Sequence, residues 1–216
     1  KELKEIVWRA NMELPRRWLV IYTFGNVSGI DREKGIFAIK PSGVEYSELT
    51  ADKIVLVDLD NKVVDSKYNP SSDTKAHTVL YRHFKNIGGV VHTHSTYATA
   101  WAQAVRPIPC YGTTHADLAS GEIPCTRLMS RKQVTGNYEE ETGKQIINRF
   151  MGLSYDEIEM VLVAGHGPFT WGKTPEKAVY NSAMLEELAK IAIFTVTVNS
   201  KTKPIPQYLI DKHYLR

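Results

Sequence analysis

The chain has 216 residues, of which 43% are hydrophobic and 24% are charged, a composition that excludes a disordered or fibrous protein. Its 27 Lys and Arg residues and 24 Asp and Glu residues give a formal net charge of only +3, which does not indicate binding to nucleic acid or to a membrane surface. Because a domain usually has about 150 residues, we expect residues 1–216 to form one domain.

The first half of the chain predicts one helix followed by several strands. Apolar residues recur at helical spacing between Leu3 and Leu14, and Pro15 helps to end this helix. A loop around Pro70 then leads into a second helix. The apolar runs that predict strands are residues 19–23, 36–39 and 54–58, with 62–64 as a hairpin return, and the second helix is expected over residues 74–84.

The second half of the chain mixes strands and helices without strict alternation. We expect strands over residues 89–92 and 160–164, helices over 97–105, 138–150 and 174–192, and turns with short extended pieces over 108–123. Thr174 and Pro175 are typical of a helix start. This order favours an α/β fold, a single domain with a central, largely antiparallel sheet flanked by helices, over a doubly wound parallel sheet.

The cysteine content bears on the cellular compartment. Cys110 and Cys125 are the only cysteines, too few for a disulfide framework, so we expect a reducing, cytoplasmic location. The longest apolar stretch, residues 191–198, is far shorter than the roughly 20 residues that a membrane span needs. The first residues predict an amphipathic helix and not a secretory leader. We therefore expect neither a membrane nor a nucleic acid among the partners.

Three histidines form the strongest candidate site. Because side chains alternate between the two faces of a strand, His92 and His94 point the same way. His166 follows another buried strand and lies between two glycines that allow a sharp turn. Three imidazoles from two strand ends suit a catalytic zinc site with an open position; the alternative is a set of hydrogen-bonded histidines without metal. Asp73 is a candidate fourth ligand, or a residue that orients one of the histidines.

Three short segments rich in small residues and hydroxyl groups predict an anion site. The helix start after Ser72 offers free N–H groups that attract a phosphate, and Lys40 is placed to add a charge-assisted hydrogen bond. Each segment taken singly is also typical of an ordinary turn. The candidate residues are Gly25, Asn26, Lys40, Ser42, Gly43, Ser71 and Ser72.

Two further candidates lie outside these segments. Asp117 is a candidate general acid or base, although its local pattern favours a helix cap. His213, near the end of the sequence, is a candidate for binding substrate, with a surface position as the alternative.

Together, these motifs resemble those of the class II aldolase and adducin-head family. The resemblance extends over essentially the whole chain, and it is closest to the branch of pentulose-phosphate 4-epimerases. Related sugar-phosphate aldolases carry a catalytic Glu at the position of Asp73, so the Asp favours the epimerase branch. The matching segments are residues 23–28, 39–44, 70–74, 92–95, 112–117, 123–127, 166–169, 171–172 and 211–216.

The resemblance implies a cofactor, an assembly and roles for individual residues. It implies one zinc ion per subunit, or another divalent metal, at His92, His94 and His166, with Asp73 close to the metal. It also implies a homotetramer with its sites at subunit interfaces. The phosphate grip falls on the anion-site residues given above, and Asp117 matches the family's acid/base aspartate. Thr113, Glu139 and His213 match positions that line or support the site.

The implied activity is the interconversion of L-ribulose 5-phosphate and D-xylulose 5-phosphate by retro-aldol cleavage and re-addition. One alternative is a class II sugar-phosphate aldolase that releases its aldehyde, which product analysis would distinguish. An adducin-like binding module without zinc, or a purely structural zinc protein, is an alternative of a different class, which a metal assay would address. The three histidines and the phosphate segments favour an enzyme that acts on a small sugar phosphate.

The sequence departs from the epimerase pattern in one respect. The second acid/base group implied by the resemblance is a tyrosine on a C-terminal tail, beyond the position of Tyr214, and the sequence given ends at Arg216. We therefore expect a chain that ends there to keep its metal and phosphate sites but to epimerise poorly.

Overall fold

Seven strands form one sheet in the order β4-β3-β2-β1-β5-β7-β6, in the computed structural model of residues 1–216. Every pair of neighbouring strands is antiparallel, which confirms the fold class expected from the sequence. The strands are β1 (Asn26–Asp31), β2 (Ile36–Ile39), β3 (Val55–Asp58), β4 (Val63–Asp65), β5 (Gly89–His92), β6 (Met160–Val163) and β7 (Gly167–Gly172).

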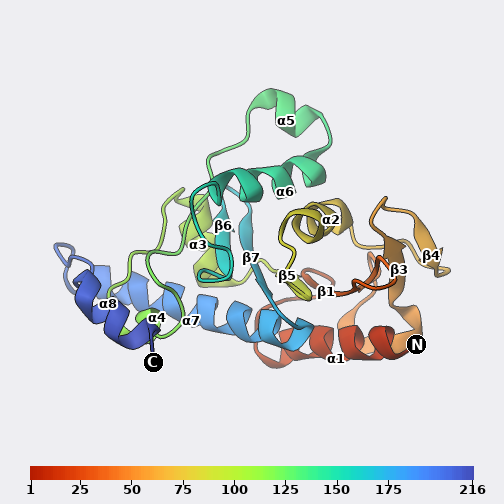
Figure 1. The fold of residues 1–216 in the computed structure, drawn as a ribbon, viewed down its shortest axis with the longest axis horizontal. Helices are drawn as coiled ribbons and strands as arrows, with labels where there is room; N and C mark the ends of the chain where they lie inside the picture. The colour runs from red at the N-terminus through yellow and green to blue at the C-terminus, as the bar shows by residue number, and fades with distance from the viewer.

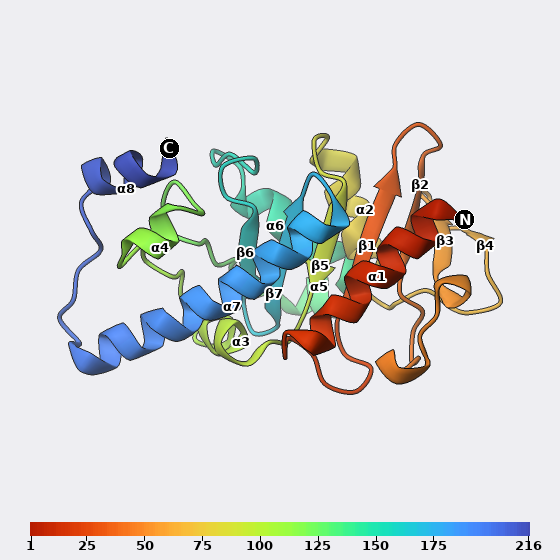
Figure 2. The ribbon, with the colours of Figure 1, turned by 90° about the horizontal axis from the view of Figure 1, so that it is seen from below.

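Helices cover both faces of this sheet. In Figure 1, α2 and α6 lie above the strands and α1 and α7 lie below them; Figure 2 shows α1 and α7 running across the lower face. The helices are α1 (Glu2–Arg16), α2 (Thr74–His83), α3 (Thr96–Gln103), α4 (Thr113–Ala116), α5 (Arg131–Thr135), α6 (Tyr138–Arg149), α7 (Pro175–Val198) and α8 (Gln207–Tyr214), with short 3₁₀ turns at Tyr46–Glu48 and Ala51–Lys53.

The core is divided by the sheet because consecutive strand residues face opposite sides. In β5, Val90 packs into the core cluster that contains Leu80 of α2. The next residue, Val91, packs into the second cluster with Val7 of α1 and Ala178 of α7. The central strands are therefore buried on both faces, which fixes the position of the loops at their ends.

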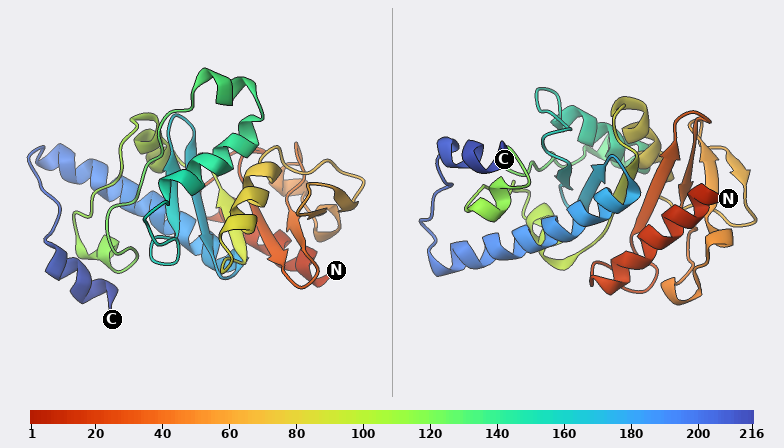
Figure 3. Two further views of the ribbon diagram at one scale, coloured as in Figure 1. Left: turned by 45° about the horizontal axis from the view of Figure 1, so that its top comes forward. Right: turned by 60° about the horizontal axis from the view of Figure 1, so that its bottom comes forward.

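The long helix α7 starts as the sequence predicts and ends beyond the sheet. The Thr174 side chain accepts a hydrogen bond from the backbone N–H of Lys177, and Pro175 occupies the first turn. Figure 3 shows α7 extending past the strands, with α8 returning beside α4. Neither α7, with 24 residues, nor any other helix is both long and apolar enough to cross a membrane.

The predicted elements with strong periodicity are confirmed within a few residues. The helices expected over 74–84 and 138–150 correspond to α2 and α6, and the strand expected over 89–92 is β5. The helix expected to end near Ala192 continues to Val198.

The strand predicted over residues 19–23 is wrong. Trp18 and Tyr22 adopt φ angles of 58° and 51°, in a left-handed region that an extended strand cannot contain. The backbone N–H of Leu19 bonds back to the carbonyl of Leu14, so the segment begins as the end of α1 and continues as a loop. The strand β1 starts only at Asn26.

Strands β1 and β7 were not predicted from the sequence, and each omission has a physical reason. In β1, Ser28 is fully buried yet polar, so the segment lacks the continuous apolar pattern of a central strand. In β7, Pro168 lies one residue after the strand begins, and proline is usually confined to strand ends and edges. The short helix α5 and the C-terminal α8 were also not predicted.

Candidate metal and phosphate site

The strand order brings the three histidines together. Strands β5 and β7 are antiparallel and pair His92 with Phe169, so the turn before β7 lies beside the end of β5. This turn carries His166, and His94 follows β5 by two residues. A Cβ at Gly167 would lie 2.7 Å from the Thr93 carbonyl oxygen. Only glycine allows the two segments to approach this closely.

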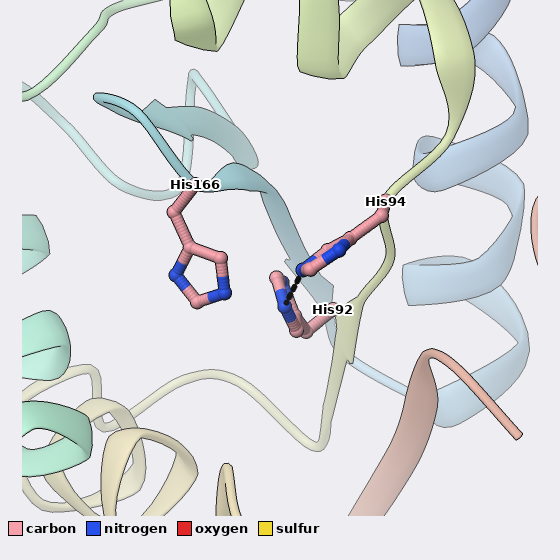
Figure 4. Close-up of side chains that lie close together, drawn as sticks. All are labelled: His92, His94 and His166. Atoms are coloured by element: carbon pink, nitrogen blue, oxygen red, sulfur yellow. Dashed lines mark hydrogen bonds between the residues drawn. The ribbon is translucent and has the colours of Figure 1, made fainter.

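The three imidazoles point into one space (Figure 4). Their nearest nitrogen atoms all lie within 4.8 Å of one another. The Nε2 atoms of His92 and His94 are 3.1 Å apart. Zinc–nitrogen bonds of about 2.0–2.1 Å place the ligand atoms of a tetrahedral site roughly 3.3 Å apart, so this spacing fits a single metal ion.

The tautomer of His92 also suits a metal. Its Nδ1 lies 2.9 Å from the Pro168 carbonyl oxygen, which only accepts hydrogen bonds. Nδ1 therefore carries the proton, and the lone pair of Nε2 faces the other two histidines. The Phe169 ring stacks on the His92 ring with centroids 4.2 Å apart, which holds the imidazole in this orientation.

The environment keeps the other two histidines neutral. Burial, with the charge of the neighbouring histidines, lowers the pKa of His166 to about 3, and burial also lowers the pKa of His94. Metal ligation requires neutral imidazole. His94 is the exposed member of the three, so the site opens to solvent on its side. The donor set of three imidazoles suits a divalent metal such as zinc.

Asp73 lies in the same cavity but outside the histidine cluster. The amide nitrogen of Asn26 donates to its Oδ2 at 2.7 Å. Burial would raise the pKa of Asp73, but the nearby His92 and His77 and the Asn26 hydrogen bond outweigh burial and hold it below its usual value. The carboxylate is therefore charged and faces the histidines.

A cavity of about 260 Å³ joins the histidines to the predicted anion segments. The backbone N–H groups of Ser42 and Ser71 bond to the carbonyls of Asn69 and Lys40, so the two serine loops are tied side by side. The predicted residues that line the cavity are Gly25, Asn26, Lys40, Ser42, Gly43, Ser71, Ser72, Asp73, His92, His94 and His166.

The hydrogen bonds of Lys40 are made to backbone carbonyl groups and leave no proton free for a ligand in the cavity. Its ammonium group donates to the carbonyls of Thr23 at 3.2 Å, Pro41 at 3.4 Å and Val44 at 2.7 Å, so all three protons have backbone partners. The side chain is 2% exposed, and burial lowers the pKa of Lys40 to about 8. Lys40 thus holds two loops together beside the cavity.

The four remaining predicted residues lie away from this chain's own cavity. His213 Nδ1 is 2.8 Å from Asp117 Oδ1, which joins α8 to the end of α4. Asp117 is the C-cap residue of α4, with its backbone N–H bonded to the Thr113 carbonyl, as the cap interpretation expects, and its carboxylate bonds to this histidine. Thr113 is the first residue of α4 and Glu139 is the second residue of α6, and neither lines the cavity.

Sequence reasoning missed two neighbours of the site. The Tyr138 ring lies 5.8 Å from the His166 ring, measured between centroids, and burial together with the charge of Asp73 raises the pKa of Tyr138. His77 is fully buried near Asp73. The spacing of four residues between Asp73 and His77 was the only sequence signal, because residues four apart lie on one helix face.

Comparison with known proteins matches the chain to a family along most of its length. The family model described as "Class II Aldolase and Adducin N-terminal domain" matches residues 5–193. Curated L-ribulose-5-phosphate 4-epimerases UlaF from Salmonella paratyphi B and Salmonella typhi are each 50% identical over 216 residues, which are 100% of this chain and 95% of each relative.

Solved structures share the fold at lower identity. An L-fuculose 1-phosphate aldolase superposes with a TM-score of 0.83 at 24% identity, covering 99% of this chain and 94% of that one. The L-fuculose 1-phosphate aldolase from Glaciozyma antarctica PI12 has a TM-score of 0.80 at 18% identity, covering 99% and 80% of the two chains. The matching fold agrees with the architecture described above.

Proposed function

The chain belongs to the class II aldolase and adducin N-terminal domain family, and we propose that it is a metal-dependent L-ribulose-5-phosphate 4-epimerase. The curated relatives at 50% identity over the full chain have this activity in their names. The observation that carries the proposal is the shared cavity, in which three histidines lie beside two serine loops. A metal-binding end and an anion-binding end within one cavity suit a small sugar phosphate.

His92, His94 and His166 would hold one zinc ion per subunit, with Asp73 as a fourth ligand or an orienting group. When bound, the metal supplies Lewis-acid stabilisation of negative charge on substrate oxygens. The serine hydroxyls and backbone donors of the two loops would bind the phosphate. Ser72 lines the cavity and has no hydrogen-bond partner within the chain, so its hydroxyl is free to donate.

The chemistry follows from the position of the carbonyl group. The C4 hydrogen of a ribulose phosphate is not acidic, whereas the C2 carbonyl permits retro-aldol cleavage of the C3–C4 bond. Cleavage gives a three-carbon fragment and glycolaldehyde phosphate. The phosphate loops retain this aldehyde, and addition to its opposite face inverts C4. Asp117 would exchange the proton of the C4 oxygen on one face.

Solvent deuterium tests the cleavage step. In D₂O, retro-aldol cleavage leaves the original hydrogen on C4, because no C4–H bond breaks. Direct deprotonation would introduce deuterium there. We expect D-xylulose 5-phosphate with protium at C4, as read by NMR, and deuterium at C4 would contradict the cleavage route.

We also propose a homotetramer in which a neighbouring subunit supplies Asp117 and His213. The support is their location, since both lie outside the cavity of their own chain, and the Asp117 side chain is 54% exposed. Mixing inactive His94→Asn and Asp117→Asn proteins tests the proposal. Shared sites predict recovered activity in mixed assemblies, because some sites then contain both native groups. Activity that stays absent in mixed tetramers would contradict it.

A further inference from the structure

A buried chain of three polar side chains lies between the sheet and α2, behind the candidate metal site. Ser28 Oγ of β1 is 2.7 Å from His77 Nδ1 and 2.7 Å from the Tyr81 hydroxyl. All three side chains are fully buried. Membership of the family does not by itself explain why β1 and α2 place hydrogen-bonded polar side chains inside the core.

The direction of these hydrogen bonds fixes the tautomer of His77, and two directions are compatible with the distances. If Tyr81 donates to Ser28 and Ser28 donates to Nδ1, both hydrogen bonds are made and the His77 proton lies on Nε2. In the reverse direction, His77 donates to Ser28 and Ser28 donates to Tyr81, which leaves the phenol proton buried without an acceptor. An unmade buried hydrogen bond costs about 1–3 kcal/mol. The first arrangement places the proton on Nε2 of His77, which also has no acceptor within the chain, so each arrangement leaves one buried donor unpaired and only the first provides a donor for Asp73.

The Nε2 atom of His77 is buried and has no partner within the chain. A buried ring nitrogen without a partner is rare and requires an explanation. His77 lies four residues after Asp73, on the same face of α2. Its ring also contacts Phe169, with centroids 6.1 Å apart, and Phe169 stacks on His92. The unpartnered Nε2 thus belongs to a side chain that follows Asp73 by one helical turn and contacts Phe169, the residue that supports His92.

We propose that His77 is a positioning residue, whose Nε2–H holds the Asp73 carboxylate in place when the site contains its metal. This role deepens the proposed function and rests on its metal site. Burial lowers the pKa of His77 to about 3, so the ring offers a hydrogen bond without a competing positive charge. Ser28 and Tyr81 act behind it by keeping the proton on Nε2.

The tautomer is measurable without metal or activity. NMR of protein carrying ¹⁵N-labelled histidine distinguishes protonated from unprotonated ring nitrogens in the metal-free chain. We expect the His77 proton on Nε2. A proton on Nδ1 would overturn the proposal, because Nε2 could not then donate to Asp73.

Metal affinity measures the consequence for the site. We expect His77→Leu to weaken zinc binding by about 10–100-fold, the usual effect of removing an orienting hydrogen bond, and to change the visible spectrum of the cobalt(II)-loaded protein. His77→Gln retains an amide donor near the position of Nε2 and should restore most of the affinity. His83→Leu is the matched control, since His83 is an exposed histidine at the end of the same helix.

A second variant, Tyr81→Phe, keeps the test of zinc affinity valid if the His77→Leu protein does not fold. Tyr81→Phe removes one oxygen and leaves His77 in place, but it no longer fixes the Ser28 proton. We expect a several-fold loss of zinc affinity with the fold intact by circular dichroism. If the His77→Leu and Tyr81→Phe proteins fold and keep wild-type zinc affinity and an unchanged cobalt spectrum, the positioning role alone is overturned. A wild-type chain that binds no divalent metal would overturn the proposed function as well.

Discussion

Among the metal-site residues, His94 is the one whose replacement should change metal binding with little effect on folding. It is exposed and lies beyond the end of β5, so its side chain contributes little to the core. His92, in contrast, is buried and anchored to Pro168. At the residue scale, the site thus combines a rigid inner histidine with an outer one that faces solvent.

We predict that His94→Asn abolishes both stoichiometric metal binding and activity, because two imidazoles do not retain zinc as three do. Metal content by inductively coupled plasma analysis and the epimerase rate measure the two effects. His83→Asn, a change on the exposed end of α2, should leave both unchanged. Full activity in a metal-free His94→Asn protein would contradict the metal site.

For Ser72→Ala, the expected effect is weaker binding of the phosphorylated substrate. Each lost hydrogen bond to a charged group is worth roughly 1.5–3 kcal/mol, so KM should rise by one to two orders of magnitude. More glycolaldehyde phosphate should also escape per turnover. An unchanged preference for phosphorylated over unphosphorylated sugar would place the phosphate elsewhere. Ser66→Ala, in a loop outside the cavity, is the control.

At the scale of elements, a pair of side chains fixes the two loops that line the cavity. The Lys40 ammonium group bonds to both the Thr23 carbonyl and the Val44 carbonyl. It also lies 4.9 Å from the centre of the Tyr46 ring, and the Tyr46 hydroxyl donates to the Gly25 carbonyl at 2.9 Å. These contacts hold the loop before β1, which contains Gly25, against the loop after β2.

We therefore predict that Lys40→Met lowers the free energy of unfolding as well as the affinity for substrate. The stability loss should be roughly 1.5–3 kcal/mol, the value of a hydrogen bond to a charged group, measured by urea denaturation. Lys53→Met is the control, because the Lys53 ammonium group makes a single, solvent-exposed hydrogen bond to the Glu48 carbonyl. A Lys40→Met protein with wild-type stability and weakened binding would instead assign the lysine to the phosphate.

The three histidines could be predicted as candidates because each lies at or just after the end of a buried apolar run, whereas the pairing of β5 with β7 that joins them was not predicted. His92 ends β5 and His94 follows it by two residues, and glycines flank His166 in its turn. The hydrogen bonds of Lys40 could not be predicted, since they depend on Thr23, 17 residues away. The strand β1 was missed for a similar reason: its buried Ser28 is satisfied by His77, 49 residues away.

The roles of Asp117, Thr113, Glu139 and His213 stay predictions. The Asp117–His213 contact joins two elements 96 residues apart in sequence, and no local pattern indicates it. The cytoplasmic location also stays an expectation from the cysteine content.

At the scale of the whole molecule, buried neutral histidines make stability depend on pH. Burial lowers the pKa of His77 to about 3 and that of His115 to about 4, against about 6.5 for an unfolded histidine. Below about pH 6.5, the unfolded chain therefore binds protons that the folded chain does not. Stability is fully present above that pH and falls as the pH decreases.

We predict that the metal-free protein loses up to about 1.4 kcal/mol of unfolding free energy per pH unit for each of these histidines. Urea denaturation at several pH values between 7.5 and 5 measures this slope. His115→Gln should make the slope less steep by removing one titrating group. A stability that is flat over this range would show that neither histidine stays neutral on folding.

The configuration at C4 of the product tests the central claim most directly. Metal-loaded protein is incubated with L-ribulose 5-phosphate, and the products are resolved by NMR beside a metal-free sample. We predict that D-xylulose 5-phosphate forms only with metal and that free aldehyde does not accumulate. Release of glycolaldehyde phosphate without an inverted pentulose, or no turnover by the metal-loaded protein, would contradict the assignment as a 4-epimerase.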